Sequence, residues 1–480
     1  MTTANVIKLT TTASEILMMD IRTIGRETLL PSTSFFRIRF DMKYSKDNIN
    51  YFFSLKYIKL LCLKSILLIL ISSCSVLNGN ETDKEKIIRE KKIEVSVIDS
   101  KSDEIREETT VHHHVHDPIL GAERMNLYLD SLKGKRIAIV SNQTSMIGKT
   151  HLVDTLLSLD VNIVKVFSPE HGFRGDADAG EKVGSSIDQK TGIPLISLYG
   201  KNKKPYPEQL SDIDVVIYDI QDVGVRFYTY ISTLHYVMEA CAENGKPIIV
   251  LDRPNPNGHY IDGPVLESSQ KSFVGMDPVP IVYGMTIGEY ALMVNGEFWL
   301  SDSLQCNLWI VPCKHYLHKS KYVLPVAPSP NLRSEAAITL YPSLCLFEAT
   351  TVSVGRGTDR PFEVYGHPKF PNKGFTFTPI SCFGAKSPLC ENILCYGYDL
   401  KNTLKKRSYE INLNWLVQAK IVLGDSIDFI NQPAFFNRLA GNSQLQQQIL
   451  TGVPIKDIRV SWKPGLDNFK KIRQRYLLYD

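Results

Sequence analysis

The stretch Asp214-Val-Val-Ile-Tyr-Asp-Ile-Gln-Asp-Val-Gly-Val-Arg226 decides the fold of this chain. Its short apolar run, rich in β-branched residues, is typical of a strand that is buried on both faces. Residues 227–244 then have the length of a helix, and Gly245 is placed to end it. A second apolar run, Lys246-Pro-Ile-Ile-Val-Leu-Asp252, completes a strand–helix–strand unit. Such a unit predicts two neighbouring parallel strands.

The same alternation of strand-like and helical segments extends toward the N-terminus. Residues 135–141, 161–167 and 193–199 are further strand-like runs, and residues 151–158 and 207–210 between them have helical spacing. We therefore predict an α/β fold, a Rossmann-like doubly wound parallel sheet over residues 119–305. After about residue 305 the alternation fades, and Gly and Pro interrupt short apolar segments. We expect a smaller C-terminal α+β auxiliary domain over residues 306–480.

Composition excludes several classes of protein. The chain has 480 residues with 43% hydrophobic and 22% charged residues, as in an ordinary globular protein. Its formal net charge of +4 is too small on this length to indicate nucleic-acid binding. The nine Cys form no CxxC pair, which argues against a zinc ribbon. Cys382, Cys390 and Cys395 lie close together in sequence and indicate buried thiols or one local disulfide rather than a metal site.

The N-terminal part has the layout of an export signal. Residues 56–74 combine three Lys with a short apolar run and two Ser, and they end at Cys74. The run is too short to span a bilayer, and Ile71-Ser-Ser-Cys74 resembles a bacterial lipobox. We expect residues 1–74 to be an upstream segment and lipoprotein signal, with the true start near Met42, and residues 75–118 to be a disordered polar linker. Cys74 would carry the lipid, so the protein would be exported and held in the bacterial envelope, facing the periplasm, by this anchor alone.

Polar residues follow three of the predicted strands. They are Ser168-Pro-Glu-His-Gly-Phe-Arg-Gly-Asp176, then Asp219–Arg226, then Asp252-Arg-Pro-Asn-Pro-Asn-Gly258. Parallel sheets bind ligands outside the carboxyl ends of their strands. We therefore expect these loops to form one polar pocket.

Common cofactor motifs are incomplete or absent. Ile147-Gly-Lys-Thr150 is half of a P-loop, but Gln143 stands where the motif needs its first Gly. No GxGxxG follows a strand and no GxSxG occurs, which argues against a dinucleotide site and an α/β-hydrolase. We expect no cofactor and no metal.

Several longer motifs carry a family resemblance. They are Phe167-Ser-Pro-Glu-His-Gly-Phe-Arg-Gly-Asp176 with Ala177-Asp-Ala-Gly-Glu-Lys-Val-Gly184, Asp219–Tyr230, Leu251-Asp-Arg-Pro-Asn-Pro256, Pro328-Ser-Pro-Asn331, Gly355-Arg-Gly-Thr358 and Arg360-Pro-Phe-Glu363. In this order they closely resemble the exo-β-N-acetylmuramidases of glycoside hydrolase family 171, over roughly residues 119–480. The resemblance implies an active site between two domains and release of N-acetylmuramic acid from the non-reducing ends of peptidoglycan fragments. The export signal agrees with a substrate outside the cytoplasm.

Glycoside hydrolysis generally needs two carboxyl groups. Glu170 directly follows a predicted strand and is the first candidate, although an ion pair with Arg174 would be a structural alternative. Glu289 is a candidate for the second carboxyl, but a glutamate in the first turn of a helix would look the same. Other candidates for the second carboxyl are Glu181, Asp222, Asp252 and Glu348.

Muramic acid carries a lactyl carboxylate, which Arg can bind through two hydrogen bonds. The candidate substrate-binding residues are His171, Arg174, Asp222, Arg226, Tyr228, Asp252, Arg253, Asn255, Arg356 and Arg360. Asn331 could bind a hydroxyl or acetamido group, and Tyr230 could face the sugar, although Tyr228 and Tyr230 could equally be core residues. The sequence does not indicate an oligomeric state. A non-catalytic lipoprotein that binds cell-wall sugars on the same fold is the alternative function.

Overall fold

The computed structural model describes residues 117–170, 172–175, 186–404 and 407–480. All of these residues belong to one compact unit. The predicted signal, the predicted lipidation site Cys74 and most of the predicted linker lie outside the described residues, as do the candidates His171 and Glu181. None of the helices in the described part of the chain is long and apolar enough to cross a membrane.

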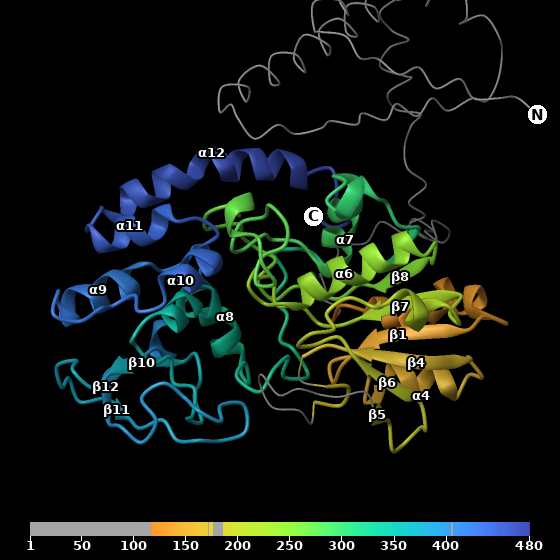
Figure 1. Ribbon diagram of the computed structural model, residues 1–480, viewed down its shortest axis with the longest axis horizontal. Helices are drawn as coiled ribbons and strands as arrows, with labels where there is room; N and C mark the ends of the chain where they lie inside the picture. Colours follow the sequence, from red (N-terminus) through yellow and green to blue (C-terminus); the bar gives the residue numbers. More distant parts are fainter. Residues whose placement is uncertain (1–116, 171, 176–185, 405–406) are drawn as a thin grey trace, which may run out of the picture. The chain divides into compact units, whose positions relative to one another are not determined.

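A seven-stranded sheet organises the first part of the chain (Figure 1), in the order β5-β6-β4-β1-β7-β8-β9. The strands are β1 (Ile137–Ser141), β4 (Ile163–Ser168), β5 (Ser186–Ile187), β6 (Pro194–Ser197), β7 (Val215–Asp219), β8 (Ile248–Leu251) and β9 (Leu308–Val311). Every pairing is parallel except the short one between β5 and β6. The predicted parallel α/β sheet is therefore confirmed.

The alternating direction of side chains along β1 explains why the sheet is covered on both faces. Ile137 and Ile139 belong to one apolar core, with side chains of α4 (Leu152–Leu157). Ala138 and Val140 belong to the other, with side chains of α6 (Tyr230–Glu243). Successive side chains of a strand point to opposite faces, so a continuous apolar run needs two layers of cover.

Helix ends agree with local chemistry. α6 ends before Gly245, whose φ of 61° is the left-handed conformation that Gly adopts without strain. α5 (Pro207–Leu210) has Pro at its first turn. α7 (Ile287–Gly296) begins with a capping box, in which Thr286 accepts from the Glu289 amide and the Glu289 carboxylate accepts from the Thr286 amide. A small hairpin of β2 (Met146–Ile147) and β3 (Thr150–His151) occupies the half P-loop.

The second part of the chain is α+β, as predicted. A three-stranded antiparallel sheet has the order β10-β12-β11, made of β10 (Val364–His367), β11 (Thr376–Phe377) and β12 (Cys395–Asp399). Its helices are α8 (Glu335–Leu344), α9 (Asn414–Leu423), α10 (Pro433–Ala440), α11 (Gln444–Leu450) and α12 (Ile455–Arg473).

Short 3-10 helices occur in both parts of the chain, at Gly121–Glu123, Met125–Leu127, Leu129–Leu132, Ser268–Gln270, Ser301–Ser303, Cys345–Ala349 and Lys401–Thr403.

The division between the two parts differs from the predicted boundary at residue 305. β9 pairs in parallel with β8, so the first sheet continues past that residue. The C-terminus also returns to the first part, because α12 runs toward α7 (Figure 1) and the Arg473 guanidinium donates to the Gly284 carbonyl at 2.9 Å. A sequence reading that ends a domain where the alternation fades misses both features.

Candidate active site

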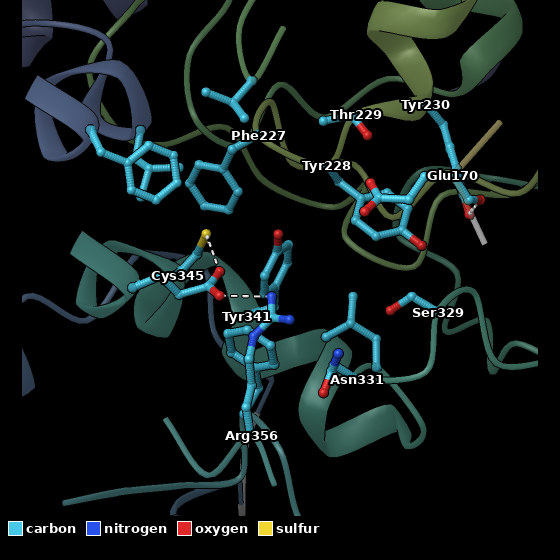
Figure 2. A pocket seen from close by; sticks show the side chains of 16 residues that line it. Glu170, Phe227, Tyr228, Thr229, Tyr230, Ser329, Asn331, Tyr341, Cys345 and Arg356 are labelled. Carbon is cyan, nitrogen blue, oxygen red and sulfur yellow. Dashed lines mark hydrogen bonds and ion pairs between the residues drawn. The ribbon is translucent and has the colours of Figure 1, made fainter. Parts of the chain in front are cut away.

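A cavity of about 250 Å³ lies where the carboxyl edge of the sheet meets the second part of the chain. The loop after β4 contributes Glu170, and residues 227–230 before and at the start of α6 contribute three aromatic side chains. The second part contributes residues 329–332, α8, the 3-10 helix Cys345–Ala349 and Arg356. Figure 2 shows Glu170 and Tyr230 across the cavity from Cys345 and Arg356. Of the three loops expected to form one pocket, only the loop after β4 contributes a lining residue, Glu170, and the second domain completes the cavity.

Glu170 is held by tyrosines of the first part. The Tyr199 hydroxyl is hydrogen-bonded to the Glu170 side chain, and burial together with the Glu170 charge raises the pKa of Tyr199 to about 12. The Tyr230 hydroxyl donates to the Glu170 backbone carbonyl at 3.5 Å and to the Pro328 carbonyl at 3.3 Å. Tyr199 follows β6 just as Glu170 follows β4, so neighbouring parallel strands bring the two together.

A second carboxyl group faces the same cavity. Glu348 pairs with the Arg356 guanidinium at 2.7 Å, and the Cys345 thiol donates to the Glu348 carboxylate at 3.4 Å. The Arg356 guanidinium also lies over the Phe362 ring, 5.3 Å from its centroid. Charge and hydrogen bonding thus fix the position of Glu348.

Aromatic rings and one amide line the space between the two carboxyl groups. The Tyr228 and Tyr230 rings meet edge to face at 4.9 Å, and the Tyr228 hydroxyl donates to the Pro328 carbonyl at 2.8 Å. The Asn331 side-chain amide donates to the Gly384 carbonyl at 2.7 Å. The tyrosine hydroxyls are therefore engaged, and the rings are the surfaces that these tyrosines offer to the cavity.

Four of the five candidate arginines do not line this cavity. Arg253 pairs with Asp219 at 2.6 Å, and both side chains are buried. Arg174 pairs with Asp154 and Asp188, and Arg360 pairs with Asp399 and Glu363. Their expected role in binding a substrate carboxylate is not supported, because none of these three side chains lines the cavity.

Arg226 is a different case, because its guanidinium binds backbone carbonyls rather than a carboxylate. Its guanidinium donates to the carbonyls of Pro264, Val279 and Leu439 at 2.8–2.9 Å. It is fully buried, and burial lowers the pKa of Arg226 to about 9. Since Leu439 belongs to α10, Arg226 joins the two parts of the chain rather than lining the cavity.

Glu289 also lies away from the cavity, in a structural position. Its carboxylate is fully buried, and it accepts from His318 at 2.8 Å and from the Leu478 amide at 2.8 Å, besides closing the capping box. The structure therefore does not bring Glu289 together with Glu170. The alternative interpretation, a structural glutamate in the first turn of a helix, describes Glu289 better. This carboxylate instead holds the returning C-terminus.

Asp252, Asp222 and Asn255 are buried near the strand ends without lining the cavity. Asp252 accepts from Thr286 at 2.7 Å and from Tyr479 at 2.6 Å, and burial raises its pKa to about 6. Burial likewise raises the pKa of Asp222 to about 6, and Asp222 accepts from the Gly224 amide at 2.6 Å. The Asn255 side chain donates to the Met285 carbonyl. These contacts fix the loops that surround the site.

Some of the predicted site residues therefore line the cavity, and the others lie elsewhere in the fold. Glu170, Tyr228 and Arg356 line the cavity, as do Glu348, Tyr230 and Asn331, which the sequence raised as further candidates. Tyr199, Tyr341 and Cys345 were missed. Tyr199 could have been found, because it ends a predicted strand at the same edge, whereas no local signal marks Tyr341 or Cys345. Among the described residues, no group of three or more His, Cys, Asp or Glu could hold a metal ion.

Comparisons with known proteins agree with this architecture. Family models described as exo-β-N-acetylmuramidase NamZ, N-terminal and C-terminal, match residues 137–336 and 339–479. The peptidoglycan β-N-acetylmuramidase NamZ of Bacillus subtilis is 41% identical over 375 residues, which cover 73% of this chain and 89% of that protein. Crystal structures of two DUF1343 family proteins of Bacteroides fragilis, 48% and 30% identical, superpose with TM-scores of 0.70 and 0.66 over 76% of this chain and 99% of each. The resemblance seen in the loops is thereby confirmed, and the chain belongs to the NamZ family of glycosidases.

Proposed function

We propose that this chain releases N-acetylmuramic acid from the non-reducing ends of peptidoglycan fragments, using Glu170 and Glu348 as its two carboxyl groups. The observation that carries the proposal is that these two side chains line one cavity between the two domains. The relative from Bacillus subtilis is a peptidoglycan β-N-acetylmuramidase, and its identity to this chain supports the substrate class.

Paired carboxyl groups supply the chemistry. One protonates the leaving oxygen, while the other activates water or attacks the sugar. Glu170, hydrogen-bonded by Tyr199, is assigned the role of acid, because a neutral phenol can share a hydrogen bond with either protonation state of a carboxyl group. Glu348, which pairs with the Arg356 guanidinium at 2.7 Å, is assigned the role of base or nucleophile.

The size of the cavity supports exo action. Its volume of about 250 Å³ is below the roughly 300–1,000 Å³ of pockets that hold drug-sized ligands. Apolar side chains, among them Phe227, Phe435 and Leu439, form part of its lining. A cavity of this size accommodates one terminal sugar rather than the interior of a glycan strand.

Arg356 is the residue proposed to recognise the lactyl carboxylate. It is the one candidate arginine that lines the cavity, and its Nε has no hydrogen-bond partner in the described part of the chain. One guanidinium can hold Glu348 and still offer donors to a substrate carboxylate, because it carries five N–H groups. The proposal extends to location: residues 56–74 would export the chain, and Cys74 would anchor it, on the side of the membrane where peptidoglycan lies.

Product analysis tests the reaction. The purified chain would be incubated with oligosaccharides that carry β-linked muramic acid at the non-reducing end, and the products would be followed by mass spectrometry. We expect free N-acetylmuramic acid and a fragment shortened by that one sugar. Internal fragments would contradict exo action, and binding without any product would favour the non-catalytic sugar-binding alternative.

A matched pair of variants tests Glu348. Glu348→Gln should lower turnover by about 10²-fold or more, as loss of a catalytic carboxyl does. Glu335→Gln makes the same chemical change at a half-exposed residue that pairs with Lys321 and does not line the cavity. Equal turnover of the two folded variants would remove Glu348 from the mechanism.

A further inference from the structure

The segment between β11 and β12 supports one wall of the cavity. Its Gly384 carbonyl accepts from the Asn331 side chain at 2.7 Å, and its Ile380 amide donates to the Gly357 carbonyl at 2.8 Å. Asn331 and Arg356, the neighbour of Gly357, both line the cavity. The position of residues 378–394 is therefore coupled to the position of two groups that face the substrate.

Two thiols meet at the end of this segment. Cys390 and Cys395 are hydrogen-bonded to each other through their side chains. A turn brings them together, because the Ile393 amide donates to the Cys390 carbonyl at 3.0 Å before β12 begins at Cys395. Cys390 also has a φ of 63°, a left-handed conformation that is uncommon for a residue other than Gly, Asn or Asp.

The two thiols differ in exposure and acidity. Cys390 is partly exposed, whereas Cys395 is fully buried. The hydrogen bond from Cys395 lowers the pKa of Cys390, and the same contact together with burial raises the pKa of Cys395. A partly exposed thiol of lowered pKa is the reactive member of a pair, and a buried neighbour is placed to resolve it.

We propose that Cys390 and Cys395 form a disulfide when the protein meets an oxidising thiol–disulfide partner, and that this bond braces the cavity wall at Asn331 and Arg356. The Cys390 thiolate attacks one sulfur of the partner's disulfide and displaces the other as a thiolate. Cys395 then loses its proton and attacks the Cys390 sulfur, which releases the partner's second thiolate. Two cysteine thiols are oxidised to one disulfide, and the partner's disulfide is reduced to two thiols.

The remaining described cysteines provide internal controls. Cys241, Cys306, Cys313 and Cys345 are buried, and buried thiols react slowly. Cys382 lies on the same segment and is partly exposed, but its thiol contacts the Phe383 carbonyl at 3.4 Å. The proposed bond should therefore form between Cys390 and Cys395 and leave Cys382 free.

Peptide mass spectrometry tests the bond. The reduced full-length protein would be treated with oxidised glutathione, alkylated without further reductant and digested with trypsin. Lys373, Lys386 and Lys401 place both partners in the peptide 387–401 and Cys382 in the peptide 374–386. We expect peptide 387–401 to carry no alkyl group and two fewer hydrogens than its reduced form, with Cys382 alkylated. Alkylation of both partners, a bridge to Cys382, or glutathione retained on Cys390 would each overturn the proposal.

Binding of N-acetylmuramic acid tests the bracing, and this measurement alone rests on the proposed function. Titration calorimetry would compare the oxidised and reduced protein, with Cys390→Ser as the variant that cannot form the bond. We expect reduction to weaken binding a few-fold in the parent and to leave Cys390→Ser unchanged, with Cys382→Ser behaving as the parent. If the bond forms but binding is the same in both states, the bracing is wrong while the bond stands.

Discussion

Replacement of Glu170 by Gln gives the sharpest test of the proposed mechanism. Glu170 follows β4, faces the cavity and is hydrogen-bonded by Tyr199, and Gln keeps its shape and an acceptor oxygen for that bond. What Gln removes is the ability to donate and regain a proton. General acid–base catalysis contributes about 10²–10⁴-fold, which corresponds to about 2.7–5.4 kcal/mol of transition-state stabilisation.

The assay is turnover of a chromogenic β-glycoside of N-acetylmuramic acid. Glu170→Gln should lose at least about 10²-fold in kcat, while its thermal midpoint and its affinity for N-acetylmuramic acid stay close to those of the parent. Glu243→Gln is the matched control, because Glu243 is a surface residue that pairs with Lys204 and does not line the cavity. A folded Glu170→Gln protein with kcat within a few-fold of Glu243→Gln would refute the assignment.

Four further predictions concern residues outside this pair of variants. Arg356→Gln should reduce the preference for muramic acid over N-acetylglucosamine glycosides, measured as the ratio of their kcat/KM values. The variant leaves the lactyl carboxylate of the substrate without its charged partner, which costs on the order of 2–5 kcal/mol. An unchanged ratio would exclude Arg356 as the lactyl-binding residue. Glu289→Ala should lower the free energy of unfolding in urea by about 1–3 kcal/mol, because it leaves the buried donors of His318 and Leu478 without an acceptor, whereas a folded Glu289→Gln protein should keep its turnover; a large loss of turnover would return Glu289 to the mechanism. Burial opposes charge on His235, but hydrogen bonds to Asp277 and Glu239 outweigh burial and raise the pKa of His235 to about 9. Up to about 3 kcal/mol of stability should therefore be fully present below about pH 6.5 and be lost as the pH rises through 9. If His235→Asn leaves the pH profile of urea unfolding unchanged, this prediction is wrong. Cys74→Ala should move the protein from the membrane to the soluble envelope fraction, and a mature chain that retains residues before 74 would rule out lipidation there.

The sheet could be predicted because its cause is local. A run such as residues 215–219, with every residue buried, needs cover on both faces, and a parallel sheet between helices provides it. The exceptions were β5, which has two exposed residues and no apolar pattern, and β9, which is short and lies after the point where the alternation fades. Pattern reasoning finds strands by their burial, so it misses a strand that is exposed or isolated in sequence.

The arginines show why the site itself was harder to predict. An Arg that follows a strand is equally suited to a substrate carboxylate and to an aspartate of the protein. Arg253 follows β8 and is bound by Asp219 at the end of β7, and Arg360 is bound by Asp399 of β12. These partners are distant in sequence and become neighbours only through strand order and packing. Residue type therefore identified charged positions without showing which of them remain available to a ligand.

Glu348 marks the limit of the rule that ligands bind at the ends of parallel strands. That rule led to Glu170, because Glu170 follows β4 of the parallel sheet. Glu348 lies instead on the 3-10 helix Cys345–Ala349 in the α+β domain, where the described strands β10, β11 and β12 pair in antiparallel fashion and the rule does not apply. Its position depends on Arg356 and Cys345, and it faces the same cavity as Glu170. Tyr341 of α8 helps to close that cavity, because its ring meets the Phe227 and Tyr228 rings edge to face. A site between two domains thus combines residues that follow strands with residues that only domain packing brings to the cavity. A sequence without its fold shows the first kind of residue more clearly than the second.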